Sequence, residues 1–540
     1  MRQKIFYTVF FIFFYQMVSA QLADSLTKRV DAVFAEYDKT NSPGCALAIL
    51  KDGKIIYERA YGMSNLEYNI AINPTSIFHI ASISKQFTAA AIIRLSLEGK
   101  LSLNDDIRKY IPEVPDFGHP ITFNNLIHHT SGIRDQWDLQ GLAGWREGDL
   151  INEKDILEMM SRQKSLNFLP GEEYLYCNSG FTLVGIAVKK ITGVSLRDYS
   201  DSVFFKPLGM TSTHFHSDHS EITPNRTSAY IKDDNGKWKI SIPVFDNYGA
   251  TSLFTTVEDL AKWDENFYNK KIGGDEFIKA MMLTGKLNDG TPQNYASGLV
   301  IGSYKGYRTE GHSGADAGYR SNLLRFPEEH FSVIIFANLA NINTASLSNK
   351  VADIFLIDKS IPTPNIKIDS NILKGWAGDY FDMNTQSTFK LDYKNEKLLT
   401  GTSELVPLSN SVFNNRSTTY TFSGDTSKNK LEIKSTGLKT KTYIKVKRNL
   451  LSATELQFYQ GDFYSEELDV KYSITVKDSV LQIKIPRHEE IEVSPFIKDI
   501  FADGFVLRFI RNKKNIIEGF YLTTGRVRNL YFSKSLNKIK

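Results

Sequence analysis

Ser82 and Lys85 carry the first chemical signal in this sequence, in the pattern Ser-Ile-Ser-Lys at the start of a predicted helix. Residues three apart on a helix share one face, so the lysine amine can lie beside the Ser82 hydroxyl and help to deprotonate it. The helix N-terminus also offers backbone N–H groups for an oxyanion. Other Ser-x-x-Lys patterns begin at Ser25, Ser161, Ser387, Ser427 and Ser535. Only Ser82 follows an apolar segment and precedes a strongly apolar helix, so we predict that it is a nucleophile.

Tyr176-Cys177-Asn178 is the second chemical element, between Pro170-Gly171 and an apolar helical segment. A tyrosine aimed at the serine can relay a proton if a nearby lysine stabilises its phenolate. The Asn178 amide can both donate to and accept from a substrate amide. Tyr176 in isolation favours a packing role, so it is the combination with Ser82 and Lys85 that indicates catalysis.

His312-Ser313-Gly314-Ala315 is the third element, at the end of a strand pattern. Gly314 would allow a substrate backbone to approach closely. The Ala315 N–H could be a second oxyanion donor. A lone histidine in a turn rich in glycine and serine is more often structural, so this element also depends on the other two.

Strands at both ends of residues 21–360, with helices inserted between them, must position these groups. Helical spacing covers Asp24–Tyr37 and Ser84–Leu97, and a hairpin is predicted around Asp52-Gly53. A second hairpin is predicted around Pro327, followed by a helix over Asn343–Ile357. This order predicts an α+β domain on an antiparallel sheet.

An internal repeat follows a predicted linker at Ile361–Pro364. Gly378-Asp379-Tyr380-Phe381 matches Gly461-Asp462-Phe463-Tyr464, and the flanking apolar positions align at the same offset. Two small all-β barrels would explain this, and one larger β domain is the alternative. The predicted division is a signal peptide at 1–20, a catalytic domain at 21–360, and β repeats at 365–450 and 451–540.

The N-terminus has the pattern of a secretory signal. Arg2 and Lys4 precede the apolar stretch Ile5–Tyr15, and small residues end at Ala20. A retained membrane anchor is the alternative, but the stretch is shorter than the roughly 20 apolar residues that span a bilayer. We therefore expect a secreted or periplasmic protein with no stable membrane span.

The composition excludes several classes of protein. The chain has 540 residues, 41% of them hydrophobic and 23% charged, which is typical of globular and not of disordered protein. A net charge of +4 over this length does not indicate a nucleic-acid partner. Cys45 and Cys177 are too few for a disulfide scaffold, and the sequence leaves open whether they pair. We expect no metal or organic cofactor, and we place the clustered His214, His216 and His219 on a surface loop.

The order and setting of the three elements resemble the penicillin-recognising serine hydrolases, which include the serine β-lactamases and the D-Ala-D-Ala peptidases. The resemblance is closest to the branch of class C β-lactamases, serine esterases and D-aminopeptidases. It spans roughly Asp24 to Ile357 and includes the stretches SPGCALAILKDGKIIYERAYG, LIHHTSGI, FFKPLGMTSTHF and GHSGADAGYRSNLLRFPEE. The β tail is similar to the two small barrels of D-aminopeptidases, where a loop reaches toward the active site. The resemblance implies a β-lactamase/transpeptidase-like domain followed by a lipocalin-like barrel region.

The same resemblance implies roles by position. Ser82 would be the acylated nucleophile, Lys85 its activating partner and Tyr176 the shared acid/base. Asn178, His312, Ser313 and Gly314 would bind substrate, and the N–H groups of Ser82 and Ala315 would form the oxyanion hole. Two positions depart from the pattern, since Cys177 replaces a common serine and His312 replaces a lysine. Histidine is mostly neutral above pH ~6.5, which weakens the recognition of a substrate carboxylate.

The sequence thus predicts a secreted serine hydrolase that forms an acyl-enzyme on small amides, D-amino-acid peptides or esters. A β-lactamase with genuine penicillin turnover is one alternative. A catalytically idle protein that binds cell-wall peptides is another, with the β tail docked on the cell wall. The three intact motifs argue against an idle protein.

Overall fold

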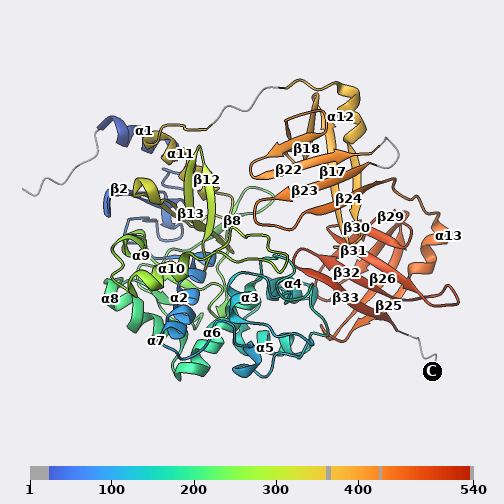
Figure 1. The fold of residues 1–540 in the computed structure, drawn as a ribbon, viewed down its shortest axis with the longest axis horizontal. Helices are drawn as coiled ribbons and strands as arrows, with labels where there is room; N and C mark the ends of the chain where they lie inside the picture. The colour runs from blue at the N-terminus through green and yellow to red at the C-terminus, as the bar shows by residue number, and fades with distance from the viewer. Residues whose placement is uncertain (1–23, 361–365, 425–428, 536–540) are drawn as a thin grey trace, which may run out of the picture.

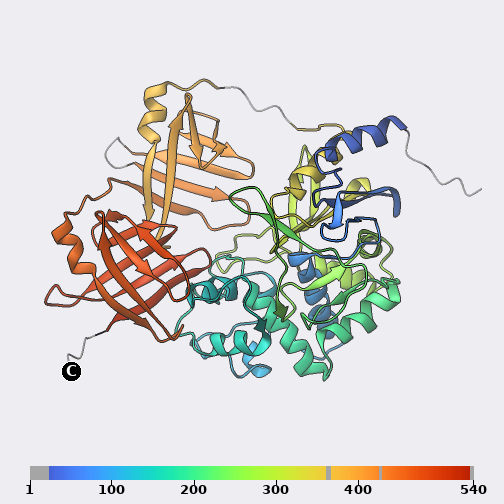
Figure 2. The ribbon, with the colours of Figure 1, turned by 180° about the vertical axis from the view of Figure 1, so that it is seen from behind.

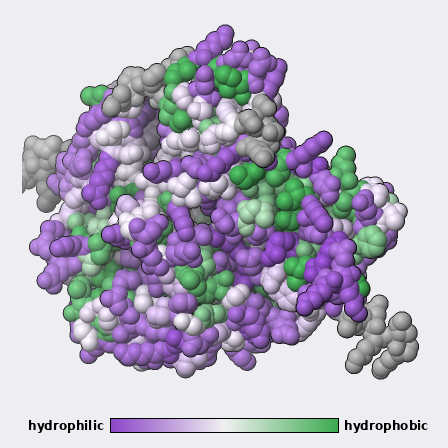
Figure 3. Space-filling model, turned by 45° about the vertical axis from the view of Figure 1, so that its right-hand side comes forward, coloured by the Kyte–Doolittle hydropathy of each residue, from purple (hydrophilic) through white to green (hydrophobic). Residues whose placement is uncertain are grey.

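The computed structural model describes residues 24–360, 366–424 and 429–535. Figure 1 shows one region of mixed helices and strands, coloured blue to yellow, with two β units in orange and red beside it. The predicted signal segment and the predicted linker at Ile361–Pro364 lie outside the described residues. Most of the molecular face in Figure 3 is hydrophilic, with smaller hydrophobic patches between the polar areas.

A six-stranded antiparallel sheet is the centre of the mixed region. Its strand order is β12 (Val300–Tyr304), β13 (Tyr307–Asp316), β14 (Tyr319–Phe326), β15 (Phe331–Ala337), β1 (Cys45–Lys51) and β2 (Lys54–Tyr61). The predicted hairpin at Asp52-Gly53 joins β1 and β2, and both of its turn residues have positive φ. A turn of this kind matches the right-handed twist of the two strands, which explains why Asp-Gly occurs there.

Alternating side chains of β1 face two separate cores, because successive strand residues point to opposite faces. Cys45, Leu47 and Ile49 pack on one face with helices α1 and α11. Ala46 and Ala48 pack on the other face in the larger core that contains α2.

The helices fall into two groups, since those of the mixed region cover the sheet and form a second lobe next to it, whereas the last two lie with the C-terminal β units (Figure 1). They are α1 (Asp24–Phe34), α2 (Ser84–Leu97), α3 (Phe123–Ile127), α4 (Gln136–Leu142), α5 (Glu153–Ser161), α6 (Asn178–Thr192), α7 (Leu196–Ser200), α8 (Lys206–Leu208), α9 (Val257–Asn269), α10 (Gly274–Met282), α11 (Thr344–Phe355), α12 (Ser370–Trp376) and α13 (Ala453–Leu456). Helix α2 has the predicted bounds and is buried on almost every side, which explains its apolar composition. Among the described residues no single helix is long and apolar enough to cross a membrane.

Short strands connect these helices. They are β3 (Met63–Asn65), β4 (Ile70–Ala71), β5 (Phe78–His79), β6 (Ile151–Asn152), β7 (His214–Phe215), β8 (Tyr230–Lys232), β9 (Trp238–Ile240), β10 (Phe245–Asp246) and β11 (Leu253–Thr255). Strand β11 pairs with β5 and β7, and this small sheet leads directly into the turn that carries Ser82.

Two nine-stranded antiparallel sheets form the C-terminal region and curl into nearly closed barrels (Figure 2). The first contains β16 (Gly378–Asp382), β17 (Ser387–Lys394), β18 (Lys397–Thr400), β19 (Ser403–Glu404), β20 (Val406–Pro407), β21 (Val412–Asn415), β22 (Thr418–Ser423), β23 (Lys430–Ser435) and β24 (Lys441–Val446). The second contains β25 (Gly461–Ser465), β26 (Val470–Lys477), β27 (Val480–Lys484), β28 (Glu490–Val493), β29 (Pro495–Ile497), β30 (Ile500–Asp503), β31 (Phe505–Arg511), β32 (Ile517–Thr524) and β33 (Val527–Lys534). Both sheets have the same strand order, and the repeated Gly-Asp motif begins β16 in one and β25 in the other. The predicted fold class, an α+β domain followed by an all-β barrel-like region, is confirmed.

The second barrel docks on the helical lobe through a buried ion pair. Arg134 is fully buried and donates to Glu467 at 2.6 Å, and its guanidinium also donates to the Arg528 carbonyl at 3.0 Å. Arg528 in turn donates its backbone N–H to the Asn167 side chain at 2.7 Å. These contacts fix the β32–β33 turn against the helical lobe.

Candidate active site

Ser82 lies in a short 3-10 turn, η1 (Ala81–Ile83), immediately before α2. The preceding residue, Ala81, has φ of +48°, in the left-handed region that residues with a Cβ rarely adopt. Such a conformation persists only where the surroundings fix it. Here the Ile80 N–H donates to the Leu253 carbonyl at 2.9 Å, which ties the turn to β11.

Two cavities meet at Ser82. The tryptophan cavity has a volume of about 300 Å³, and its walls include Trp137, Trp145, Phe245 and Asp316. The histidine cavity has a volume of about 570 Å³ and is lined by His312, Tyr295 and Arg320, among others. Because Ser82 lines both, a substrate bond at its hydroxyl could extend into one cavity on each side.

Lys85 lies beneath Ser82 and is fully buried. Its Nζ is 3.1 Å from Ser82 Oγ, 2.8 Å from Asn178 Oδ1 and 2.7 Å from the Ala250 carbonyl oxygen. Burial lowers the pKa of Lys85 to about 7, and the Arg526 guanidinium contributes in the same direction. At neutral pH a large share of the molecules therefore holds a neutral amine, which can accept the serine proton.

Asp135 fixes the orientation of Asn178. Asp135 Oδ2 accepts the Asn178 backbone N–H at 2.6 Å and its side-chain Nδ2 at 2.9 Å. The Oδ1 of Asn178 must then point toward Lys85, where it accepts a hydrogen bond. Asp135 is also the N-cap of α4, since its other oxygen accepts the Trp137 N–H.

The Tyr176 ring packs against both Lys85 and His129. Lys85 Nζ is 4.9 Å from the centroid of the Tyr176 ring. The centroid of the His129 ring is 4.2 Å from the same point. The hydroxyl is buried without a hydrogen-bond partner among the described residues, which leaves it available to a substrate. Burial raises the pKa of Tyr176, and the neighbouring Ser82 hydroxyl partly opposes this increase. The Cys177 thiol donates to the Ile133 carbonyl at 3.3 Å, so it does not replace a catalytic group.

Gly314 is required by the close approach of β13 to the Ser82 turn. A Cβ at this position would lie 2.4 Å from the Ile80 carbonyl oxygen and 2.2 Å from Ser321 Oγ. Only glycine allows this contact, and it brings Ala315 to the same two cavities as Ser82. The arrangement is compatible with an oxyanion site between the backbone N–H groups of Ser82 and Ala315.

His312 is buried and held on both sides. Its Nδ1 is 2.5 Å from the Ser313 carbonyl oxygen, and its Nε2 is 3.1 Å from the Tyr295 hydroxyl. A carbonyl oxygen only accepts, so Nδ1 carries the proton and Nε2 accepts from Tyr295. Burial lowers the pKa of His312 to about 4, so the third motif presents a neutral imidazole at pH 7.

Arg526 comes from the β32–β33 turn of the second barrel and lines both cavities. Its Nη1 is 3.2 Å from Asp135 Oδ2, and its Cζ lies 5.3 Å from the centroid of the Tyr176 ring. The backbone N–H of Arg526 donates to Asp138 at 2.6 Å, which holds the turn in place. The C-terminal region therefore supplies a cation to the site.

Two groups of described side chains outside the two cavities have metal-ligating chemistry. One is Asp218, His219 and Asp246, in which His219 already pairs with Asp246 at 2.9 Å. In the other, the ligand atoms of His214, His216 and Glu221 all lie within 4.8 Å of one another. However, Arg197 donates to both Glu221 oxygens, at 2.5 and 2.7 Å, and occupies the carboxylate. The predicted surface loop is wrong for His214 and His216, because both lie at or next to β7 and His216 is buried.

The structure brings all the sequence-predicted site residues together around Ser82. Ser82 and Lys85 lie in the η1 turn and at the start of α2, and Asn178 begins α6, with Tyr176 two residues before it. Strand β13 carries His312, Ser313, Gly314 and Ala315. No motif in the sequence points to Asp135, Asp316 or Arg526. Asp316 directly follows the third motif, and this adjacency was the one local signal available.

Comparisons with known proteins agree with this geometry. Residues 30–353 match the family model described as Beta-lactamase. The D-aminopeptidase of Gluconobacter oxydans (strain 621H) is 26% identical over 318 residues, which are 59% of this chain and 60% of that protein. The chain spans about 60 to 66% of the length of the curated relatives it matches.

Solved structures show the same fold. The octameric penicillin-binding protein homologue from Pyrococcus abyssi matches with a TM-score of 0.55 and 25% identity, over 78% of this chain and 99% of that one. The D-amino acid amidase from Ochrobactrum anthropi SV3 matches in fold with a TM-score of 0.50 and 19% identity, over 61% of this chain and 98% of that one. The chain therefore belongs to the Beta-lactamase family, within the penicillin-recognising serine hydrolases that its motifs indicated.

Proposed function

We propose that this protein hydrolyses D-amino-acid amides or peptides, or small esters, through an acyl-enzyme at Ser82. The observation that carries the proposal is the contact between Lys85 Nζ and Ser82 Oγ at 3.1 Å, in a site that lowers the pKa of Lys85 to about 7. A lysine that is partly neutral near pH 7 is a competent general base. The preference for D-amino-acid substrates is supported by the D-aminopeptidase relative.

Acylation proceeds in two steps. Neutral Lys85 accepts the proton of Ser82 as Oγ attacks the carbonyl carbon, and the negative charge moves to the carbonyl oxygen. The N–H groups of Ser82 and Ala315 stabilise that oxyanion. The bond to the leaving amine or alcohol then breaks, and Tyr176 donates a proton to the leaving atom while Lys85 reprotonates Tyr176.

Deacylation reverses the roles. A water molecule loses a proton to Tyr176 as its oxygen attacks the acyl carbon, and Tyr176 passes its own proton to the neutral Lys85. When the ester bond breaks, Lys85 returns this proton to Ser82 Oγ. Asn178 stays fixed by Asp135 and keeps one amide hydrogen that it can donate to the bound substrate. His312 keeps Tyr295 in position and contributes shape and polarity to the histidine cavity.

Penicillin turnover is the nearest rival activity. The neutral imidazole of His312 does not replace the lysine cation of β-lactamases, which disfavours it. The test compares nitrocefin with p-nitrophenyl acetate and D-Ala-p-nitroanilide, with Ser82→Ala as the control. We expect ester and amide hydrolysis that Ser82→Ala abolishes. Fast nitrocefin hydrolysis without either activity would make the protein a β-lactamase.

An idle peptide-binding protein is the rival from another class. It predicts neither turnover nor labelling of Ser82 by a fluorophosphonate probe. The close approach of Lys85 to Ser82 favours an enzyme over a binding protein, because peptide binding does not require an activated serine.

We also propose that the protein is exported, on the basis of Arg2, Lys4 and the apolar stretch that follows them. N-terminal sequencing of the protein purified from its natural host tests this proposal. A mature chain that begins near Gln21 is expected, and an intact Met1 would contradict cleavage.

A further inference from the structure

The tryptophan cavity has the features of a ligand site in addition to its contact with Ser82. The rings of Trp137 and Phe245 stack with their centroids 4.9 Å apart and form one wall. The Gln140 side chain also lines this cavity and is 2% exposed. Both its amide nitrogen and its amide oxygen lack a hydrogen-bond partner among the described residues. A buried amide without partners is costly, so we infer that this cavity accepts a polar ligand.

The cations that line the cavity have ion-pair partners, but its carboxylates have none among the described lysines and arginines. Its two cations are engaged, since Arg526 pairs with Asp135 and Arg146 pairs with Asp149 at 3.3 Å. Two carboxylates, Asp316 and Glu147, line the cavity without a lysine or arginine within ion-pair distance in the described part of the chain, and Glu147 accepts only the Ser241 hydroxyl at 3.0 Å. Of the two, Asp316 is next to the oxyanion residue Ala315. Its remaining charge favours a cationic group on the ligand.

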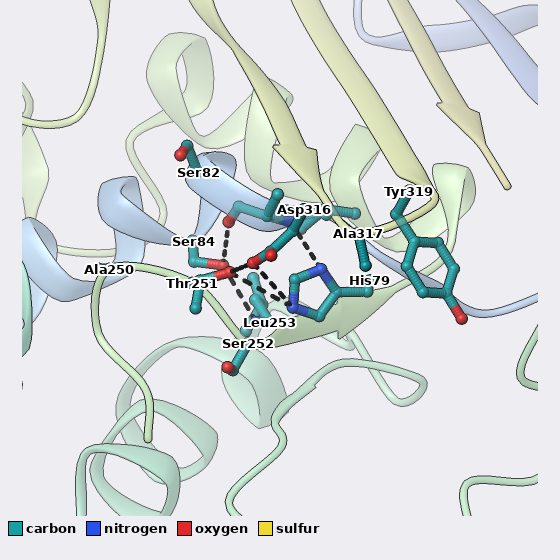
Figure 4. A network of polar contacts seen from close by, with 12 residues as sticks. His79, Ser82, Ser84, Ala250, Thr251, Ser252, Leu253, Asp316, Ala317 and Tyr319 are labelled. Atoms are coloured by element: carbon teal, nitrogen blue, oxygen red, sulfur yellow. Dashed lines mark hydrogen bonds and ion pairs between the residues drawn. The ribbon is translucent and has the colours of Figure 1, made fainter. Parts of the chain in front are cut away.

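A polar network holds the Asp316 carboxylate at the cavity wall (Figure 4). Thr251 donates to Asp316 Oδ2 at 2.6 Å, and His79 Nε2 is 3.9 Å from the same oxygen. His79 Nδ1 accepts the Ala81 N–H at 3.2 Å, so its proton is on Nε2 and faces Asp316 and Thr251. The Oδ1 oxygen of Asp316 has no donor among the described residues, and 17% of the side chain remains exposed.

The charge states of these groups are compatible with binding a cation. Burial lowers the pKa of His79 to about 3, so His79 is neutral and does not compete for the carboxylate. Burial raises the pKa of Asp316 to about 6, and the carboxylate is therefore mostly ionised above neutral pH.

The position of Asp316 relative to the reacting atoms identifies the cation. Asp316 directly follows Ala315, whose N–H faces the oxyanion in the proposed mechanism. An α-amino nitrogen is two bonds from the carbonyl carbon that Ser82 attacks. Since Ser82 and Asp316 line the same cavity, an acyl residue placed there can present its α-amino group to Asp316.

We propose that Asp316 binds the α-ammonium group of the acyl residue, so that the enzyme selects substrates with a free amino terminus. The side chain of that residue lies against Trp137, Trp145 and Phe245. This inference rests on the proposed function, because it needs an acyl group at Ser82.

The experiment uses the full chain and two boronic acids that form a reversible tetrahedral adduct with a nucleophilic serine. One is D-configured 1-amino-2-phenylethylboronic acid, and the other is 2-phenylethylboronic acid, which lacks only the amino group. Their inhibition constants are measured against p-nitrophenyl acetate hydrolysis. The variants are Asp316→Asn, which keeps the shape and removes the charge, and Asp353→Asn as a control that breaks an exposed ion pair with Lys305.

We expect the amino compound to inhibit the wild type about 10- to 100-fold more strongly, the range of one hydrogen bond between charged groups. Asp316→Asn should bring the ratio close to one, and Asp353→Asn should leave it unchanged. A wild-type ratio close to one would overturn the proposal even if Asp316→Asn did not fold, and so would a ratio that survives in Asp316→Asn. Normal ester hydrolysis with a ratio of one refutes only the Asp316 site, whereas an inert, unlabelled Ser82 removes the proposed function and this inference together.

Discussion

Arg526 should control the pH at which the enzyme becomes active, although it belongs to the C-terminal barrel. It lies 5.3 Å from the centroid of the Tyr176 ring, and Lys85 Nζ lies 4.9 Å from the same centroid. The two charges are thus at most about 10.2 Å apart, the sum of these distances. At an effective dielectric constant of about 20, their repulsion is at least about 1.6 kcal/mol. A repulsion of this size lowers the pKa of Lys85 by about one unit.

The change Arg526→Gln removes that repulsion and also frees the Asp135 carboxylate from its ion pair. Both effects favour protonated Lys85, so its pKa should rise from about 7 to about 8. Because only the neutral amine accepts the serine proton, kcat/KM rises with pH through this pKa. At pH 7 the neutral fraction falls from about one half to about one tenth, and we expect a roughly fivefold loss of kcat/KM.

The assay is the pH profile of kcat/KM with p-nitrophenyl acetate, which has no charged group to contact Arg526. The variant should approach wild-type activity near pH 9. Arg526→Lys retains the charge and should keep the profile near that of the wild type. Arg508→Gln removes a cation that lines neither cavity and serves as the matched control. A loss that is the same at every pH would refute the electrostatic coupling, and so would an unchanged profile in Arg526→Gln.

Three further predictions concern the geometry of the site. Tyr176→Phe keeps the ring but removes the proton relay, so turnover should fall roughly 10²-fold or more, and near-normal turnover would show that Lys85 acts alone. Gly314→Ala should abolish Ser82 labelling by a fluorophosphonate, because the new Cβ would lie 2.4 Å from the Ile80 carbonyl oxygen and displace the Ser82 turn. The far-UV circular dichroism should stay close to that of the wild type. Normal labelling would mean that β13 can move away from the turn without loss of the site. Arg134→Met leaves Glu467 buried without its partner and should lower the free energy of unfolding by about 3 to 5 kcal/mol in denaturant titration, whereas a loss under 1 kcal/mol would show that the pair does not hold the barrel in place.

The local pattern of the sequence predicts the elements that build the site. Ser84–Leu97 is a helix with the predicted bounds, and Asp52-Gly53 forms the predicted hairpin. Both elements are determined by periodicity and turn chemistry within a short stretch of chain, and the rest of the fold does not change them. The motif order then indicates the family correctly, because each motif occupies a fixed place in one fold.

Contacts between distant segments could not be predicted in the same way. Arg526 reaches the site only because the second barrel docks through Arg134 and Glu467, and no local pattern encodes that docking. The error at His216 has the same cause. A polar stretch favours a surface loop, but β7 pairs with β11 and buries the side chain against Phe254.

The central claim is that Ser82 is acylated with neutral Lys85 as its base. The most direct measurement is the rate of fluorophosphonate labelling as a function of pH, with the modified residue located by peptide mass spectrometry. We predict a single adduct on Ser82, formed at a rate that rises with pH through a pKa of about 7. An adduct on another residue, or a rate on Ser82 that does not change between pH 5 and pH 9, would contradict the claim.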